Sequence, residues 1–485
     1  MDAVHFKSAS ELAVMIRDKK IGCVELLDQF LRRVAEHNSK INAVVWLDEE
    51  RARARARKAD EALARGEIWG ALHGLPISVK ESYQLAGSPT TWGDPTYEKN
   101  VTQTTALAVQ RLEAAGAVTF AKTNVPIHLA DWQSFNEIYG TTKNPWNLDL
   151  TPGGSSGGSA AALAAGLTGF DAGSDIGASI RNPAHYCGVF GLKPTYGIIP
   201  TRGQALPGVV APADIAVVGP MGRGAGDLAV GLDIMSGPDL VDDIGWRLEL
   251  PEAKQNSLDQ FRVAVKLSDP NSEVDEEYSG ILQDFADCLA KTGAIVSDRA
   301  RPEIDTARLN EIYISLLRAA TSLRVDDDEI ARLSDAARNA TKYDANSYLA
   351  TMVRAIRMGH REWLGLNNER HALRLAFNEF FKEWDILLCP AAASPAWRHD
   401  QVGDRHDRTI PVNGRQVATT DQLFWAGFSG VVYLPSTVGP AGMTAAGLPV
   451  GYQAIAGQYR DKTAIRFSEL VEQEIIGFVP PPNFL

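Results

Sequence analysis

Two glycine- and serine-rich segments constrain the fold of this chain more than any other feature. The first is Thr151–Ser159 and the second is Asp171–Arg181, and a short predicted helix, Ala160–Gly166, lies between them. Glycine lets the backbone approach another group closely, and consecutive N–H groups form concavities that bind anions. Hydroxyl groups beside such concavities supply what acyl transfer requires, a nucleophile next to an oxyanion hole. The flanking residues are apolar, which favours ordered loops over a flexible linker.

The glycine pattern alone does not determine which serine is the nucleophile. Residues 153–157 fit the Gly-x-Ser-x-Gly elbow, which nominates Ser155. That pattern is weak in a chain with 42 glycines, and it also requires an acid and a histidine. A phosphate-binding loop fits less well, because no Gly-Lys-Ser/Thr closes the segment. The histidines available to an elbow, none in a diagnostic sequence context, are His185, His360, His371, His399 and His406.

A lysine ends a short apolar run upstream of both segments. Ile77–Val79 is predicted to be a strand, and Lys80 follows it directly. On position alone, a lysine there is more often a surface residue than a buried one. If it is buried, desolvation lowers its pKa, and the neutral amine can then act as a general base.

Three motifs, taken in their order along the chain, resemble the amidase signature family. They are Gly-Leu-Pro-Ile-Ser-Val-Lys-Glu at 74–81, Gly-Gly-Ser-Ser-Gly-Gly-Ser at 153–159, and Ser-Asp-Ile-Gly-Ala-Ser-Ile-Arg-Asn-Pro-Ala at 174–184. Each motif alone is weak, but the combination is specific. The resemblance is dense from about Leu72 to Arg202, is thin after that, and resumes near the C-terminus.

The resemblance implies a role for each matching residue. Ser179 is implied to be the acylated nucleophile, and Ser155, 24 residues earlier, to relay its proton after a cis peptide that follows Gly154. Lys80 is implied to be the base, uncharged in the resting enzyme. The remaining implied residues are the oxyanion-hole amides of Ile176, Gly177, Ala178 and Ser179, and the loop-orienting side chains of Ser156, Asp175 and Arg181.

One residue departs from the pattern of the resembled family. Many members have Gly-Gly-Ser where this chain has Gly177-Ala178-Ser179. The methyl group of alanine disfavours the positive φ angles that glycine tolerates. We therefore expect Ala178 to narrow the pocket or tilt one oxyanion donor, which would affect rate and substrate range without abolishing activity.

The residues expected to line the substrate pocket are apolar. They are Leu129, Trp132, Phe424 and Trp425, and as pocket lining they favour a small apolar or aryl amide. Each of them, taken singly, suits a protein core equally well. His128 and Asp131 form an alternative catalytic pair, although a lysine–serine–serine set requires no histidine.

Short β-rich runs alternate with helical ones, which predicts an α/β/α layered fold with a central mixed, largely parallel twisted sheet and helical additions. We expect a single domain spanning 1–485. Its parts are a helical N-terminal region at 1–66, the signature core at 72–202 and a helical insertion at 303–382. The insertion is expected to include one long helix, Ser347–Phe381, and a further helix is predicted at Ala225–Met235.

Composition limits the partners that this chain can have. A net charge of −12 argues against a nucleic-acid surface or an anionic membrane, and no apolar run is long enough to span a bilayer. The N-terminus lacks the pattern of a signal peptide. The four cysteines lack metal-ligand spacing, so we expect free thiols in the cytoplasm, with no metal and no cofactor. The resemblance adds the expectation of a homodimer.

Three functions remain open on the sequence. The first is an amidase for a small-molecule carboxylic amide, with esters, anilides or carbamates as further substrates. The second is the glutamine-hydrolysing component of a tRNA-dependent amidotransferase. Against it, residues 208–218 read Gly-Val-Val-Ala-Pro-Ala-Asp-Ile-Ala-Val-Val, unlike the Ser-Ser-Leu-Asp type of sequence usual there. The third is a non-catalytic binding relative, which the presence of all three catalytic residue types disfavours.

Overall fold

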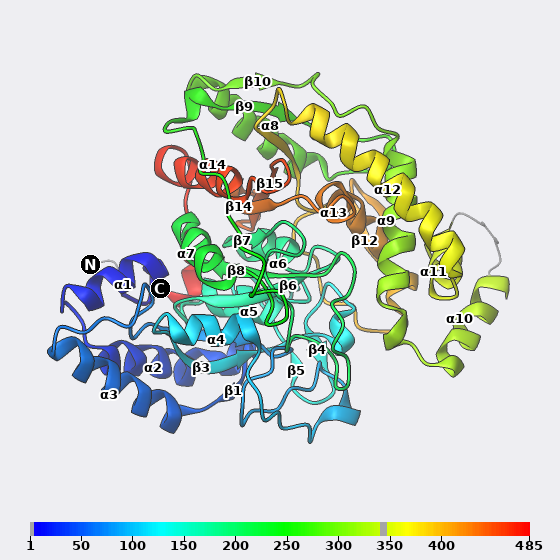
Figure 1. Cartoon of the computed structure of the whole chain (residues 1–485). Helices are drawn as coiled ribbons and strands as arrows, with labels where there is room; N and C mark the ends of the chain where they lie inside the picture. The colour runs from blue at the N-terminus through cyan, green and yellow to red at the C-terminus, as the bar shows by residue number, and fades with distance from the viewer. Residues whose placement is uncertain (1–3, 340–346) are drawn as a thin grey trace.

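An 11-stranded mixed sheet runs through the centre of the molecule (Figure 1). The computed structural model describes residues 4–339 and 347–485. The strand order is β1-β3-β2-β6-β8-β7-β14-β15-β11-β9-β10. The bounds of these strands are β1 Val44–Leu47, β2 Pro76–Lys80, β3 Val118–Thr123, β6 Asp171–Asp175, β7 Phe190–Lys193, β8 Val217–Gly222, β9 Arg262–Val265, β10 Ile295–Ser297, β11 Ile386–Pro390, β14 Ser436–Met443 and β15 Pro449–Ile455. Two separate hairpins pair β4 Phe135–Asn136 with β5 Gly140–Thr141 and β12 Thr409–Val412 with β13 Arg415–Ala418.

Helices flank this sheet, as Figure 1 shows. Their bounds are α1 Ala9–Arg17, α2 Cys23–Ile41, α3 Glu49–Ala64, α4 Leu107–Ala114, α5 Gly157–Ala164, α6 Arg181–Cys187, α7 Ala225–Met235, α8 Glu276–Lys291, α9 Thr306–Ala320, α10 Asp327–Asn339, α11 Tyr348–Ile356, α12 His360–Phe380, α13 Phe424–Gly430 and α14 Asp461–Glu474. Three short 3₁₀ helices matter for the site: η3 Ile127–Leu129, η5 Ser322–Arg324 and η6 Arg405–Asp407.

The predicted fold class, an α/β/α layered fold with a mixed sheet, is confirmed. Parallel pairs occur in two groups, β3-β2-β6 and β11-β9-β10. Antiparallel pairs join β6, β8, β7, β14, β15 and β11, so the middle of the sheet is less parallel than the sequence predicts. Strand β6 was predicted as part of a loop, because Asp-Ala-Gly-Ser-Asp has none of the β-branched or aromatic residues typical of strands.

The N-terminal region contains a strand as well as the predicted helices. Ser8 accepts a hydrogen bond from the backbone of Glu11, whose side chain bonds back to Ser8, and this capping box begins α1. Asn42 ends α2 in the left-handed conformation. β1 then pairs with the edge of β3, so residues 1–66 are not wholly helical.

The predicted helical insertion corresponds to α9, α10, α11 and α12 (Figure 1, yellow-green to yellow). The single helix expected over Ser347–Phe381 is divided into α11 and α12, and Gly359 is the N-cap of the second. Residues 340–346 of the predicted insertion lie outside the described residues. α9 packs against α11, α12 and α13 and carries buried apolar residues toward the site.

The remaining features bear on partners. Within 4–339 and 347–485, no helix has both the length and the apolar character needed to cross a bilayer. The four cysteines are free thiols, and Cys23, Cys187 and Cys389 are buried.

Candidate active site

Lys80 is buried at the end of β2, between β3 and β6. Both neighbouring strands run parallel to β2, and parallel sheets are generally covered on both faces. The side-chain nitrogen Nζ lies 2.6 Å from Ser155 Oγ, 3.0 Å from Ser156 Oγ and 3.0 Å from Ser174 Oγ. The fold thus places Lys80 among three hydroxyls, not at the surface.

Burial lowers the pKa of Lys80 well below its ordinary value, because water no longer solvates the ammonium form. The carboxylates of Asp175 and Asp171 raise this pKa, and the guanidinium of Arg324 lowers it further. Burial also raises the pKa of Asp171 to about 7. A neutral amine at Lys80 is therefore favoured by its surroundings, and a neutral amine can accept a proton.

Ser155 and Ser156 lie in the loop that leads into α5, and the peptide bond between Gly154 and Ser155 is cis. The backbone N–H of Ser156 donates to the carbonyl oxygen of Ser179 at 3.0 Å. This bond joins the first serine loop to the loop that follows β6. The hydroxyl of Ser179 has no hydrogen-bond partner among the described residues, and it borders the same small cavity as Ser155.

The three hydroxyls around Lys80 differ in their other partners. Ser156 Oγ donates to the carbonyl oxygen of Ser174 at 3.4 Å, and Ser174 Oγ accepts from Gln204 Nε2 at 3.1 Å. Lys80 is the one hydrogen-bond partner of the Ser155 hydroxyl within the described chain. A neutral amine has two N–H donors and one lone pair. The shortest contact, with Ser155, is the one best suited to the lone pair, which leaves the two N–H groups for Ser156 and Ser174.

The loop after β6 is held by hydrogen bonds to its carbonyl groups. Tyr313 of α9 donates its hydroxyl to the carbonyl oxygen of Ile176 at 2.9 Å. Trp132 donates its indole N–H to the carbonyl oxygen of Gly177 at 2.7 Å. Because a peptide group is planar, fixing a carbonyl also fixes the direction of the N–H that follows it.

Three of the four predicted oxyanion donors are free in this structure. The N–H groups of Ile176, Gly177 and Ser179 donate to none of the described residues. The N–H of Ala178 is the exception, because it donates to Asp175 Oδ1 at 3.1 Å. Its place among the expected donors is therefore corrected: this amide fixes the loop.

A buried ion pair anchors the same loop. Arg181 Nη2 lies 2.8 Å from Asp175 Oδ1, and Arg181 Nε lies 3.0 Å from Asp175 Oδ2. Burial alone would raise the pKa of Asp175, but Arg181 holds it below its ordinary value. Arg181 Nη1 also donates to Ala426 O, Ser429 Oγ and Gln453 Oε1, which ties the loop to α13 and β15. These contacts satisfy both buried charges, as a buried ion pair requires.

Ala178 adopts a conformation that the sequence did not predict for an alanine. Its φ angle is +67°, the left-handed region in which glycine is usual. The expectation that the methyl group excludes positive φ is wrong. The surrounding contacts, including the bond from Ala178 N–H to Asp175, hold the residue there.

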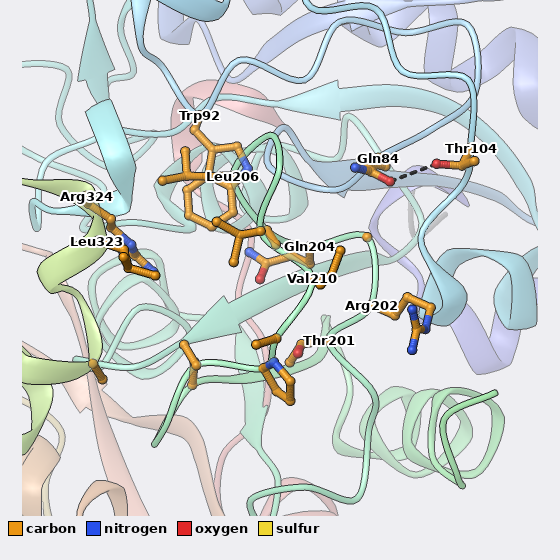
Figure 2. Close-up of a pocket in the computed structure, with 18 of the residues that line it drawn as sticks. Gln84, Trp92, Thr104, Thr201, Arg202, Gln204, Leu206, Val210, Leu323 and Arg324 are labelled. Atoms are coloured by element: carbon orange, nitrogen blue, oxygen red, sulfur yellow. Dashed lines mark hydrogen bonds between the residues drawn. The ribbon is translucent and has the colours of Figure 1, made fainter. Parts of the chain in front are cut away.

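Three cavities meet at the serine loops. A small cavity of about 20 Å³ is bordered by Ser155 and Ser179. A cavity of about 120 Å³ shares with it Leu129, Ile176, Ser179 and Arg324. A larger cavity of about 570 Å³ shares with it Trp92, Gln204, Ala216 and Arg324. Figure 2 shows this larger cavity, with Leu206 beside Trp92 and with Leu323 and Arg324 entering from η5.

Two of the four predicted pocket residues border the site. Leu129 and Trp132 line the 120 Å³ cavity. Phe424 and Trp425 do not: Trp425 is buried in the core of α13, and Phe424 lines a separate cavity. Adjacent residues of a helix point about 100° apart, and here Leu423, at the start of α13, lines the cavity that borders Ser179.

The histidine alternatives are not assembled. His128 Nε2 lies 2.6 Å from Asp94, whereas Asp131 pairs with Arg408 at 2.6 Å, so His128 and Asp131 are not a pair. Among the described residues, no histidine forms a hydrogen bond with Ser155 or Ser179.

One group of described side chains has ligand atoms close enough together to hold a metal ion. It consists of Asp404, His406 and Asp407, on a loop remote in sequence from the serine motifs. Asp404 already pairs with Arg332 at 2.7 Å. This group does not border the three cavities.

Sequence reasoning missed several residues that border the site. Arg318, Arg324 and Arg405 line the 120 Å³ cavity, and Gln204 borders the small one. Arg405 lies in a distant loop and carries no local signal. The segment Leu-Leu-Arg-Ala-Ala-Thr-Ser-Leu-Arg at 316–324 has two arginines and no acid, which is a weak sign that their charges serve another partner.

Comparison with known proteins follows the same fold and site. In Bacillus velezensis, the first subunit of the glutamyl-tRNA(Gln) amidotransferase is 32% identical to this chain, over 96% of both chains. The indoleacetamide hydrolase of Bradyrhizobium diazoefficiens is 30% identical, over 96% of this chain and 86% of that protein. The solved structure of 6-aminohexanoate cyclic dimer hydrolase with its substrate superposes with a TM-score of 0.79 at 26% identity, covering 100% of both chains.

The family model for amidases matches residues 25–465. This match covers most of the chain, including both serine segments and Lys80. The protein therefore belongs to the amidase family, as the resemblance of its motifs implied.

Proposed function

We propose that this protein is an amidohydrolase that cleaves the C–N bond of a carboxylic amide through an acyl-enzyme on Ser179. One observation carries the proposal. A buried lysine, Lys80, contacts Ser155 at 2.6 Å, and Ser155 shares a cavity with the unbonded hydroxyl of Ser179. Membership of the amidase family supports it.

In the proposed acylation step, protons move from Ser179 to Ser155 and from Ser155 to Lys80. The oxygen of Ser179 attacks the amide carbonyl carbon, and the neutral amine of Lys80 becomes an ammonium. The free N–H groups of Ile176, Gly177 and Ser179 are the proposed donors to the oxyanion. Such preorganised donors commonly supply the largest share of stabilisation in acyl transfer.

Collapse of the tetrahedral intermediate breaks the C–N bond. The proton held by Lys80 passes through Ser155 to the leaving nitrogen, so the amine departs neutral. Water then attacks the ester on Ser179 and loses a proton to the same base, and the carboxylic acid leaves. The larger cavity beyond Gln204, lined by Trp92 and Leu206, suits an apolar or aryl part of the substrate.

Partitioning with hydroxylamine tests the acyl-enzyme. A primary amide and the anilide of the same acid are hydrolysed in the presence of hydroxylamine, and the ratio of hydroxamate to acid is measured. We expect the same ratio from both substrates, because both form one acyl-enzyme. A ratio that depends on the leaving group, or the absence of hydroxamate during turnover, would contradict the proposal.

The second candidate is the glutamine-hydrolysing component of a tRNA-dependent amidotransferase, favoured by the 32% identity to one component of such an enzyme over 96% of both chains. This candidate predicts that glutamine is hydrolysed and that activity rises when a partner protein co-purifies. The amidohydrolase predicts turnover of simple amides by the purified chain alone, whether as a monomer or as the expected homodimer. Assays of glutamine and simple amides before and after size-exclusion chromatography separate the two.

A further inference from the structure

The 120 Å³ cavity beside the proposed nucleophile has a positively charged wall. Arg318 of α9, Arg324 of η5 and Arg405 of η6 all line it. Across the part of the chain that the structure describes, none of the three forms an ion pair with a carboxylate. The one acid on the described wall, Asp131, is already paired with Arg408 at 2.6 Å. Three positive charges therefore face this cavity without a balancing charge from the protein.

Arg324 is held in position without being neutralised. Its guanidinium carbon lies 5.2 Å from the ring centroid of Trp92, and Nη1 donates to the carbonyl oxygen of His128 at 3.0 Å. A guanidinium has five N–H donors, so most of its hydrogen-bonding capacity is unused. Arg324 also lines all three cavities that meet at the serine loops.

The other two arginines share one aromatic ring. Arg318 and Arg405 lie over Tyr348, with their guanidinium carbons 5.3 Å and 6.0 Å from its centroid. Arg405 also donates to the Tyr348 hydroxyl at 2.7 Å and to the carbonyl oxygen of Ala130 at 2.6 Å. The buried Nε of Arg318 has no hydrogen-bond partner among the described residues. Rings and carbonyls thus orient these groups while their positive charge is retained.

The charges destabilise one another in the empty cavity. Burial, together with the nearby Arg318, lowers the pKa of Arg324 to about 10, and burial lowers the pKa of Arg318 as well. Buried charges in proteins are normally paired. A bound anion would supply the missing partner through charge-assisted hydrogen bonds, and guanidinium groups bind carboxylates in a bidentate manner.

The backbone that orients Arg324 has an unusual conformation. His128 and Leu129 have φ angles of +50° and +58°, and His128 carries the carbonyl that Arg324 contacts. Two consecutive non-glycine residues in the left-handed region cost on the order of 1–3 kcal/mol each, and such conformations cluster at ligand sites. Both residues line the 120 Å³ cavity.

The arrangement of the walls indicates which part of the substrate enters the charged cavity. Ser155, the proposed proton donor to the leaving amine, borders the small cavity but not the charged one. Gln204 and Ala216 line the small cavity and the large apolar one. The leaving group therefore belongs toward the large cavity, and the acyl group toward the arginines.

We propose that the substrate is an amide whose acyl part carries a carboxylate, and that Arg324, with Arg318 and Arg405, binds this carboxylate. The proposal rests on the amidohydrolase function proposed above. A volume of about 120 Å³ corresponds to about four water molecules at about 30 Å³ each, so the acyl chain is short. Monoamides of short dicarboxylic acids fit this description, and the charged wall replaces the apolar acyl pocket expected from the sequence.

The test compares matched substrates on wild type and on Arg324→Gln. The substrates are malonamate, succinamate and glutaramate, each paired with the neutral amide that has a methyl group in place of the carboxylate. We expect kcat/KM of the wild type to be at least 100-fold higher for the best anionic member than for its neutral partner. Because a charge-assisted hydrogen bond is worth about 1.5–3 kcal/mol, Arg324→Gln is expected to reduce this preference by about 10-fold to 150-fold.

The control is Arg332→Gln, which removes an exposed arginine of α10 that pairs with Glu329 and Asp404 outside the cavities. It is expected to keep both the preference and the rate. Equal or better turnover of the neutral amides by the wild type overturns the carboxylate proposal and leaves the amidohydrolase intact. So does a preference for amides with the carboxylate on the amine part, or no turnover of the anionic series by an enzyme whose Ser179 reacts with a fluorophosphonate. Absence of both turnover and labelling instead contradicts the proposed function.

Discussion

Replacement of Ser179 by alanine is expected to reduce kcat for amide hydrolysis by about 10⁴-fold or more, because the acyl-enzyme can no longer form. The hydroxyl removed has no hydrogen-bond partner among the described residues, so the fold should be retained. Steady-state release of ammonia or amine measures the effect, and thermal unfolding checks the fold.

The matched control is Ser159→Ala in α5. Ser159 is also buried, but its hydroxyl bonds to Thr123 and borders none of the three cavities. We expect its kcat to stay within about threefold of the wild type, since no proposed proton path includes it. If Ser179→Ala kept more than about 1% of the wild-type kcat, another residue would have to be the nucleophile.

Replacement of Lys80 by methionine is the second large effect. Methionine has a similar shape but cannot accept a proton, and general-base catalysis typically contributes 10²-fold to 10⁴-fold. We therefore expect kcat/KM to fall by about 10³-fold or more, because Ser155 also loses its one described partner. A decrease of less than about tenfold would mean that Lys80 is not the base.

The pH profile supplies the sign. In the wild type, kcat/KM should rise with pH as Lys80 loses its proton, and it should level off well below the ordinary pKa of lysine, because burial lowers this pKa. Asp171 raises the pKa of Lys80, so Asp171→Asn should shift the rise to lower pH. Arg324 lowers it, so Arg324→Gln should shift the rise to higher pH. Lys80→Met should lack this rise altogether.

The sequence predicted the residues of the site better than their surroundings. The motifs around Lys80, Ser155 and Ser179 brought the right side chains into one region, because each motif is a strand end or a loop next to a strand end. Helix α7 was predicted at its observed bounds, Ala225–Met235, because a glycine precedes its acidic first turn and apolar residues fill its buried face.

Features that depend on distant contacts were not predictable. Position alone left Lys80 open between surface and core, and the pairing of β2 with β3 and β6 decided it. The positive φ of Ala178 depends on bonds from a loop that closes onto Asp175. The charged wall combines Arg318 and Arg324 with Arg405, about 80 residues further along the chain, so no local pattern announces it.

The most direct measurement is peptide mapping by mass spectrometry after treatment with a fluorophosphonate, on the wild type and on Ser155→Ala and Lys80→Met. The account predicts a single adduct on Ser179, formed more slowly in both variants because the proposed proton path is broken. An adduct on Ser155 that persists in Ser179→Ala, or no adduct on an enzyme that hydrolyses amides, would contradict the assignment of Ser179 as the nucleophile.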